Sequence, residues 1–135
     1  MKRLRIAVDG SDQAVRLVRQ MVLQAISPFV DPCLLMGAGI AIGEIVTNAW
    51  VHGNGRNPDK QIELCLRIQP DSLIVQVYDQ GPGFNPNRLA APVPGQEHGY
   101  GIHLARKEVR SLKYYRTEGR FCAQLLLNRK VENPV

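Results

Sequence analysis

The sequence has little cysteine and no long apolar run, and each absence excludes a class of protein. Its three cysteines, Cys33, Cys65 and Cys122, stand apart among apolar residues. Their spacing fits no metal site, so we expect three buried, reduced thiols. The longest apolar stretches, such as Leu125–Leu127, are soon broken by charge, which argues against a membrane span. No apolar signal core follows the basic start, Met1–Arg5, and this predicts a cytoplasmic protein.

The composition predicts one globular domain over residues 1–135. The chain is 44% hydrophobic and 21% charged, which is typical of a folded domain and unlike a disordered chain. The formal net charge is +5, and aromatic residues make up only 6%. The basic residues are scattered and no run interleaves them with aromatics, so we expect no direct binding of nucleic acid.

Hydrophobic periodicity predicts the element order β-α-α-β-β-loop-α-β-β. A long segment rich in Gly and Pro, from Gln80 to Gly101, has no period and is expected to be a functional loop. The order favours an α+β fold: a two-layer α/β sandwich with a mixed sheet of about five strands and helices on one face. The strands are expected at 4–8, 62–68, 73–78, 113–117 and 121–127, and the helices at about 12–27, 32–51 and 102–112.

The second expected helix carries the first candidate motif. Glu44, Asn48 and His52 are four residues apart, so they lie along one helical face. A carboxylate and a carboxamide on an otherwise apolar helix are costly to bury unpaired. The pattern fits a functional site about as well as it fits a solvated helix edge.

Two glycine-rich motifs flank the long loop. In Asp79-Gln80-Gly81-Pro82-Gly83 an aspartate ends an apolar strand, and the glycines let a ligand approach the backbone; an ordinary turn would use the same residues. In His98-Gly99-Tyr100-Gly101-Ile102 the glycines open a helix, whose N-terminus presents free N–H groups to anions such as phosphate. Neither motif is specific by itself.

The order and spacing of the three motifs resemble the Bergerat ATP-binding fold. Within that fold the chain is similar to the anti-sigma-factor serine/threonine protein kinases, whose helix reads Glu-x-x-x-Asn-Ala-x-x-His-Gly. Residues Glu44–Gly53 match this pattern throughout, and the resemblance extends over essentially the whole chain. It implies an enzyme that binds ATP and Mg²⁺.

The resemblance also implies roles for individual residues. Asn48 would be the protein ligand of the Mg²⁺ that bridges the ATP phosphates. Glu44 would be the general base at the acceptor hydroxyl. His52 would lie beside the nucleotide, although a helix-end histidine satisfied by the backbone fits equally well. The remaining nucleotide contacts would come from the glycine-rich motifs: Asp79 at the adenine amino group, Gly81 and Gly83 beside the base, and Gly99, Tyr100 and Gly101 at the phosphates.

The same resemblance implies partners, namely a sigma factor and a small anti-anti-sigma antagonist that is phosphorylated. A homodimer is expected, with the first strand, Leu4–Val8, as a plausible edge for pairing. The last hairpin, Gly119–Ala123, lacks the Gly-Thr that is common in the family, and the loop between Gly83 and Gly99 is short and proline-rich. An ATP-responsive binding module with little kinase activity therefore stays open as the alternative.

Overall fold

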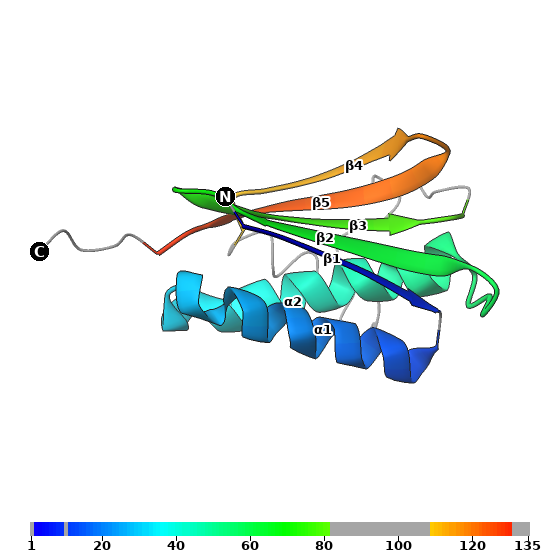
Figure 1. Ribbon diagram of the computed structural model, residues 1–135, viewed down its shortest axis with the longest axis horizontal. Coiled ribbons are helices and arrows are strands. Elements are labelled where there is room, and N and C mark those ends of the chain that lie inside the picture. The colour runs from blue at the N-terminus through cyan, green and yellow to red at the C-terminus, as the bar shows by residue number, and fades with distance from the viewer. Residues whose placement is uncertain (1, 10, 82–108, 131–135) are drawn as a thin grey trace, which may run out of the picture.

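The computed structural model describes residues 2–9, 11–81 and 109–130 of the 135-residue chain. A five-stranded sheet and two long helices form two layers, as Figure 1 shows. The elements in chain order are β1 (Lys2–Asp9), α1 (Asp12–Ile26), the 3₁₀ turn η1 (Ser27–Phe29), α2 (Pro32–Asn48), the π turn η2 (Ala49–Gly53), β2 (Gln61–Ile68), β3 (Ser72–Asp79), β4 (Ser111–Thr117) and β5 (Arg120–Asn128).

The sheet has the strand order β1-β2-β3-β5-β4, and every neighbouring pair is antiparallel. The expectation of a mixed sheet was therefore wrong for the described strands. Two successive helices separate β1 from β2, so the chain returns to the end at which β1 stopped, and β2 runs back along β1. Strands β3 and β4 are separated in the sheet by β5, which pairs antiparallel with both.

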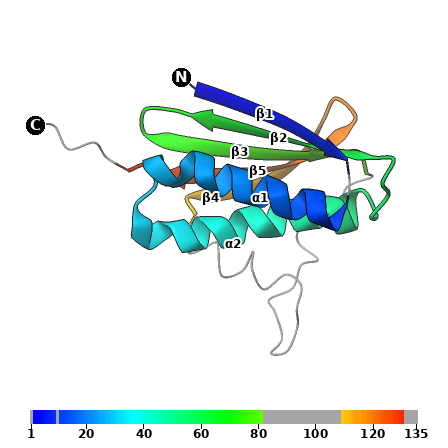
Figure 2. The ribbon, with the colours of Figure 1, turned by 60° about the horizontal axis from the view of Figure 1, so that its bottom comes forward.

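Both long helices cover the same face of the sheet (Figure 2). In α1 the buried residues recur three and four apart at Val15, Val18, Val22 and Ile26, which is the stripe expected of an amphipathic helix. Ser11 caps this helix by accepting a hydrogen bond from the backbone N–H of Ala14 at 3.0 Å. A capping bond of this kind satisfies one of the free donors of the first turn.

Helix α2 is the core helix of the domain. The expectation that the chain has no long apolar run was wrong: taken together with η2, the segment Pro32–Gly53 is long and apolar enough to cross a membrane by length and composition alone. However, 56% of its most apolar 18-residue stretch is buried inside the protein. Ile42, Ile45 and Val46 are almost fully buried in the hydrophobic core. Packing against the sheet and α1 accounts for its apolar character.

The helix does not end as a regular α-helix at Val51. At η2 it widens into a π turn, in which the backbone N–H of Asn54 donates to the carbonyl of Ala49 at 2.8 Å. Single π turns inside helices are frequent at functional sites. The indole Nε1 of Trp50 donates to Asp12 Oδ1 at 2.9 Å, which fastens the widened turn to the start of α1.

Most of the other predicted elements are confirmed within a few residues, with two corrections. The third helix, expected over 102–112, lies mainly outside the described residues, but its expected end is wrong because β4 already begins at Ser111. Cys65 and Cys122 are buried as expected, whereas Cys33 is exposed. Cys33 lies in the first turn of α2, ahead of the buried residues of that helix, which begin at Gly37.

Candidate functional site

The candidate site forms where the end of α2 meets the end of β3. Gly53 closes η2, and Gly81 follows β3 by two residues. A β-carbon on Gly81 would overlap the backbone carbonyl of Gly53, and a β-carbon on Gly53 would overlap the Asp79 carboxyl group. Glycine is required at both positions because the two backbones approach so closely.

Asp79 is the central ionisable group of this junction. Its side chain is only 2% exposed, on the side of the sheet that faces the helices. One carboxylate oxygen accepts a hydrogen bond from the backbone N–H of Gly81 at 2.9 Å. Burial raises the pKa of Asp79, while that hydrogen bond and the charges of Arg116 and Lys60 act in the opposite direction. A buried carboxylate with a perturbed pKa in such a place is typical of a ligand-binding site.

Asn54 holds the junction together, although it was not among the residues predicted for the site. Its side chain is 2% exposed. It accepts from the backbone N–H of Gln80 at 2.8 Å and donates to the carbonyl of Gln61 at 3.1 Å. The Gln80 side chain in turn accepts from the backbone N–H of Gln61 at 2.8 Å. The polar residue between two glycines was the only sequence signal for this clamp.

Arg116 reaches the same junction from β4. Its guanidinium donates to the carbonyl of Gly81 at 3.3 Å, and its charge lowers the pKa of Asp79 against the larger effect of burial. Arg116 lies far from the motifs in sequence and is brought to them only by the pairing of β4 with β5 and of β5 with β3. Periodicity alone therefore gave no indication of its position.

Asn48, in the last turn of α2, is a buried amide with an unsatisfied donor. Its side chain is 4% exposed, and its Nδ2 has no hydrogen-bond partner among the described residues. A buried amide without a partner is costly. Such an amide is well suited to a polar ligand, because rotation by half a turn presents its oxygen in place of its nitrogen.

Glu44, one turn earlier, lines a groove between the two helices. It is half-buried, and the cavity of about 400 Å³ is lined by Val15, Arg16, Arg19, Ile40, Gly43, Glu44, Val46 and Thr47. Arg19 lies over Gly43, where an added β-carbon would be 3.0 Å from its Nε. Two arginines thus line the same groove as Glu44. Neither arginine was singled out as a site residue from the sequence.

His52 does not share the surroundings of Asn48. Its side chain is exposed, whereas that of Asn48 is buried. The expectation that Glu44, Asn48 and His52 lie along one helical face assumed α-helical spacing throughout. The π turn changes the rotation about the helix axis between Asn48 and His52, so this spacing does not hold there. Of the other predicted site residues, Gly83, Gly99, Tyr100 and Gly101 lie outside the described residues.

Comparison with known proteins assigns the chain to a family. A model of the histidine kinase-like ATPase domain matches residues 10–126, which is most of the chain. The chain belongs to the histidine kinase-like ATPase domain family. A domain of this ATPase family binds ATP. The predicted Bergerat fold is confirmed. A search among curated proteins gives no significant match.

Two solved structures show the fold of the ATPase domain. The RsbU and RsbW domains of Rv1364c from Mycobacterium tuberculosis are 20% identical, with a TM-score of 0.67 over 100% of this chain and 35% of that one. The histidine kinase domain of the blue-light activated kinase from Erythrobacter litoralis EL346 is 16% identical, with a TM-score of 0.56 over 89% and 64%. The chain thus spans about a third of the first structure and less than two thirds of the second.

The raised pKa of Asp79 predicts how pH changes stability. The folded protein holds this proton more tightly than the unfolded chain, whose reference pKa is 3.8. The stabilising contribution is therefore complete below that value and is lost as pH rises through the higher folded pKa. We expect Asp79→Asn to gain stability relative to wild type as pH rises from about 4 to neutrality, because the variant has no charge to bury.

Urea unfolding followed by circular dichroism across this pH range measures that difference. Asp71→Asn is the matched control, since Asp71 lies at an exposed turn before the start of β3. A variant that instead loses stability relative to wild type toward neutral pH would show that the native state favours the Asp79 carboxylate, and would contradict the expectation.

Proposed function

We propose that this chain is an ATP-dependent regulator that phosphorylates a serine or threonine of a small antagonist protein and also binds a sigma factor. The observation that carries the proposal is the junction of Asp79, Gly53 and Gly81, next to the last turn of the helix that bears Glu44 and Asn48. The matched family is an ATPase family, and one similar structure contains an RsbW domain, from the anti-sigma-factor kinases. We propose a cytoplasmic site of action, where ATP is available.

Asp79 is the proposed adenine selector. A carboxylate accepts up to about four hydrogen bonds, and the bond from Gly81 uses only part of that capacity. The amino group of adenine is a donor of matching polarity. Burial of Asp79 strengthens such a bond, because little water competes for it.

Asn48 is the proposed protein ligand of Mg²⁺. Among the described residues no group of three or more His, Cys, Asp or Glu could hold a metal ion alone. That fits Mg²⁺, which keeps waters and substrate phosphate oxygens around it and needs only one or two protein ligands. The amide oxygen of Asn48 is the atom that would ligate the metal, and its Nδ2, which has no partner among the described residues, remains a donor for a phosphate oxygen. Bound Mg²⁺ would neutralise charge that develops on the phosphates.

Glu44 is the proposed general base for the acceptor hydroxyl. It lies one turn from Asn48 on α2, about 6 Å along the helix axis, and it opens onto the groove with Arg16 and Arg19. A hydroxyl that enters this groove can give its proton to the Glu44 carboxylate. Phosphoryl transfer depends mainly on such positioning and on charge stabilisation.

The same proposal includes a homodimer paired through β1. Strand β1 is one edge of the sheet, and Leu4 on it is 37% exposed. Unpaired backbone groups at an edge invite pairing with a second strand. Sedimentation at micromolar concentration should give twice the chain mass of 15.1 kDa, and a clean monomer at that concentration would reject this part of the proposal.

Nucleotide binding is the first test. We expect wild type to bind Mg-ADP in a calorimetric titration and Asp79→Asn to bind it about tenfold to a hundredfold more weakly, because the amide oxygen is an uncharged and weaker acceptor and its N–H₂ group faces the adenine donor unfavourably. Competition by pyrophosphate should be the same for both proteins. Asp71→Asn, with the same change of charge, should bind as wild type does. Absence of any binding at millimolar Mg-ADP would overturn the proposed function.

Phosphoryl transfer is the second test, with labelled ATP and a candidate antagonist protein. Glu44→Gln should keep nucleotide affinity and slow serine phosphorylation by roughly 10²–10⁴-fold, since the amide cannot take a proton. Asn48→Ala should lose both affinity and rate. Met36→Ala, on the same helix and 79% exposed, should change neither.

Two results would change the assignment. Equal rates for wild type and Glu44→Gln would remove Glu44 from the mechanism. A wild type that binds nucleotide but phosphorylates none of the candidate antagonists would favour the ATP-responsive binding module over the kinase.

A further inference from the structure

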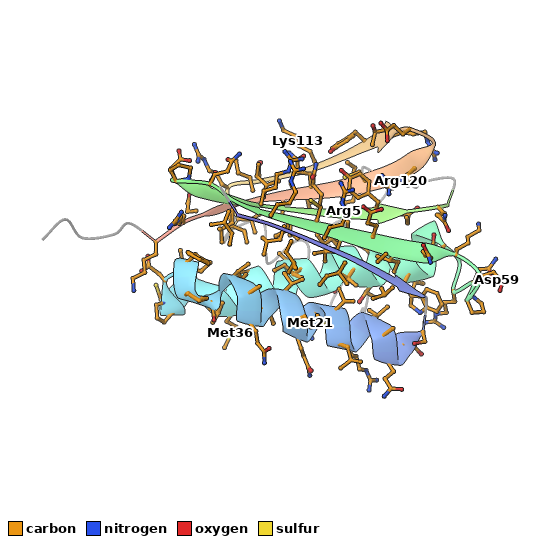
Figure 3. All side chains as sticks on the ribbon, in the orientation of Figure 1. Arg5, Met21, Met36, Asp59, Lys113 and Arg120 are labelled. Atoms are coloured by element: carbon orange, nitrogen blue, oxygen red, sulfur yellow. The ribbon has the colours of Figure 1, made fainter. Side chains whose placement is uncertain are left out.

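The face of the sheet opposite the helices, here called the open face, is not used by the nucleotide site. The strand register places three rows of residues on this face. Each row runs across all five strands and has one residue from each strand. Figure 3 shows Arg5, Lys113 and Arg120 on this side, whereas Met21 and Met36 lie on the far side of the helices. The rows are Arg3-Arg67-Ile74-Leu126-Ser111, Arg5-Cys65-Gln76-Gln124-Lys113 and Ala7-Glu63-Tyr78-Cys122-Tyr115, with Arg120 beside the third.

The open face is strongly basic. Between the strand ends, Glu63 is its only carboxylate among the described side chains, and it already pairs with Arg5 at 3.0 Å and Arg120 at 2.7 Å. Arg3 and Arg67 stand directly opposite each other on β1 and β2. Like charges in that relation destabilise a sheet. No salt bridge to either is present in the described part of the chain.

The guanidinium of Arg67 is only partly satisfied by hydrogen bonds within the described structure. Its Nη2 donates to Gln76 Oε1 at 2.8 Å, but its Nε is buried and has no hydrogen-bond partner among the described residues. Lys113 ends the middle row, opposite Arg5, and is exposed on the edge strand β4. Three cationic side chains of this face thus lack a carboxylate within the described structure: Arg3, Arg67 and Lys113.

The floor between these cations is rigid and only partly polar. Gln76 is 4% exposed and donates to the Tyr115 hydroxyl at 2.9 Å and to Gln124 at 3.0 Å. This network lies across three strands and holds its side chains in place. Ile74 and Leu126 are half-buried beside it. A partly apolar floor with a charged rim is typical of a protein-docking surface.

We propose that the open face is a docking surface for an acidic protein partner, held by Arg3, Arg67 and Lys113 around the Gln76 network. Charge complementarity identifies the partner, because carboxylates are what this rim lacks. The inference is independent of the nucleotide site, which lies on the helix side of the sheet. It also leaves the β1 edge available, since pairing at an edge extends a sheet without covering its faces.

Three other occupants fit less well. A second copy of the chain would bring one basic face against another, and like charges repel. Single-stranded nucleic acid would use free aromatic faces for stacking. Of the two tyrosines in these rows, Tyr78 has its ring covered by the Arg120 guanidinium at 4.3 Å from its centroid, and Tyr115 is held by its hydroxyl in the Gln76 network. A membrane would need exposed apolar side chains beside the cations, and Leu17, Met21 and Met36 belong to the helices on the other side.

The test is an NMR titration of the labelled full chain with a short polyglutamate peptide, in saturating Mg-ADP and at low and high salt. Shifts should map to the open face in β1, β2, β4 and β5 and should weaken at high salt as the charges are screened. Arg3→Glu/Lys113→Glu should bind the peptide about tenfold more weakly, since each exposed pair contributes modestly and reversal adds repulsion. Lys113→Glu alone should show a smaller loss.

Arg56→Glu/Lys130→Glu is the matched control, with the same change of net charge at exposed positions outside the open face; it should bind as wild type does. Shifts confined to the helices, or equal losses in both double variants, would overturn the proposal. Tighter binding of an oligonucleotide of equal charge, or of anionic vesicles, would overturn it in favour of those partners. Dimerisation altered by Lys113→Glu in sedimentation would assign the face to a second copy.

Discussion

The close backbone contact between Gly53 and Gly81 is the constraint on which the rest of the site depends. With no β-carbon at either position, the end of α2 reaches the end of β3 and covers the Asp79 carboxyl group. The π turn is what brings Gly53 there, because it adds a residue to the last turn after Asn48. Asn54 then closes the junction by donating to the Gln61 carbonyl at the start of β2 and accepting from the Gln80 N–H just after β3.

This junction works against the stability of the fold, which is a reason to regard it as functional. Asp79 is buried with its pKa raised, and Asn48 has an amide donor without a protein partner among the described residues. Each is unfavourable in a folded core. Proteins break the rules of good packing mainly at sites that bind a ligand. A nucleotide with a donor for Asp79 and polar groups for Asn48 would relieve both costs at once.

Much of the fold follows from the sequence because its signals are local. The alternation in β1, β2 and β3 and the stripe in α1 each reflect one element packed against one core, and they located those elements within a few residues. Other features depend on which elements become neighbours in space, and no local pattern predicts them. These features are the direction of the strands, the position of Arg116 and the clamp made by Asn54. The π turn at Ala49–Gly53 replaced a regular turn without any change in hydrophobic period, so no pattern in the sequence predicted it. The burial predicted for Cys33 was wrong because burial at the start of a helix depends on which other element packs against that turn, and the sequence around Cys33 does not reveal it.

The two faces of the sheet divide the chemistry of the domain. On the helix side, apolar residues of β2, β3 and β5 form the core. The core ends at Asp79, so the nucleotide recognition proposed there would rest on buried polar atoms. On the open face the same strands carry cations around a glutamine network, and recognition there rests on exposed charge. Tyr78 and Asp79 are neighbours in β3 but point to opposite faces, and Arg116 and Arg120 likewise lie on opposite sides near the β4–β5 turn. A partner on the open face would therefore sit one sheet thickness from the nucleotide, with β3 and this hairpin as the shared elements through which the two sites could influence each other.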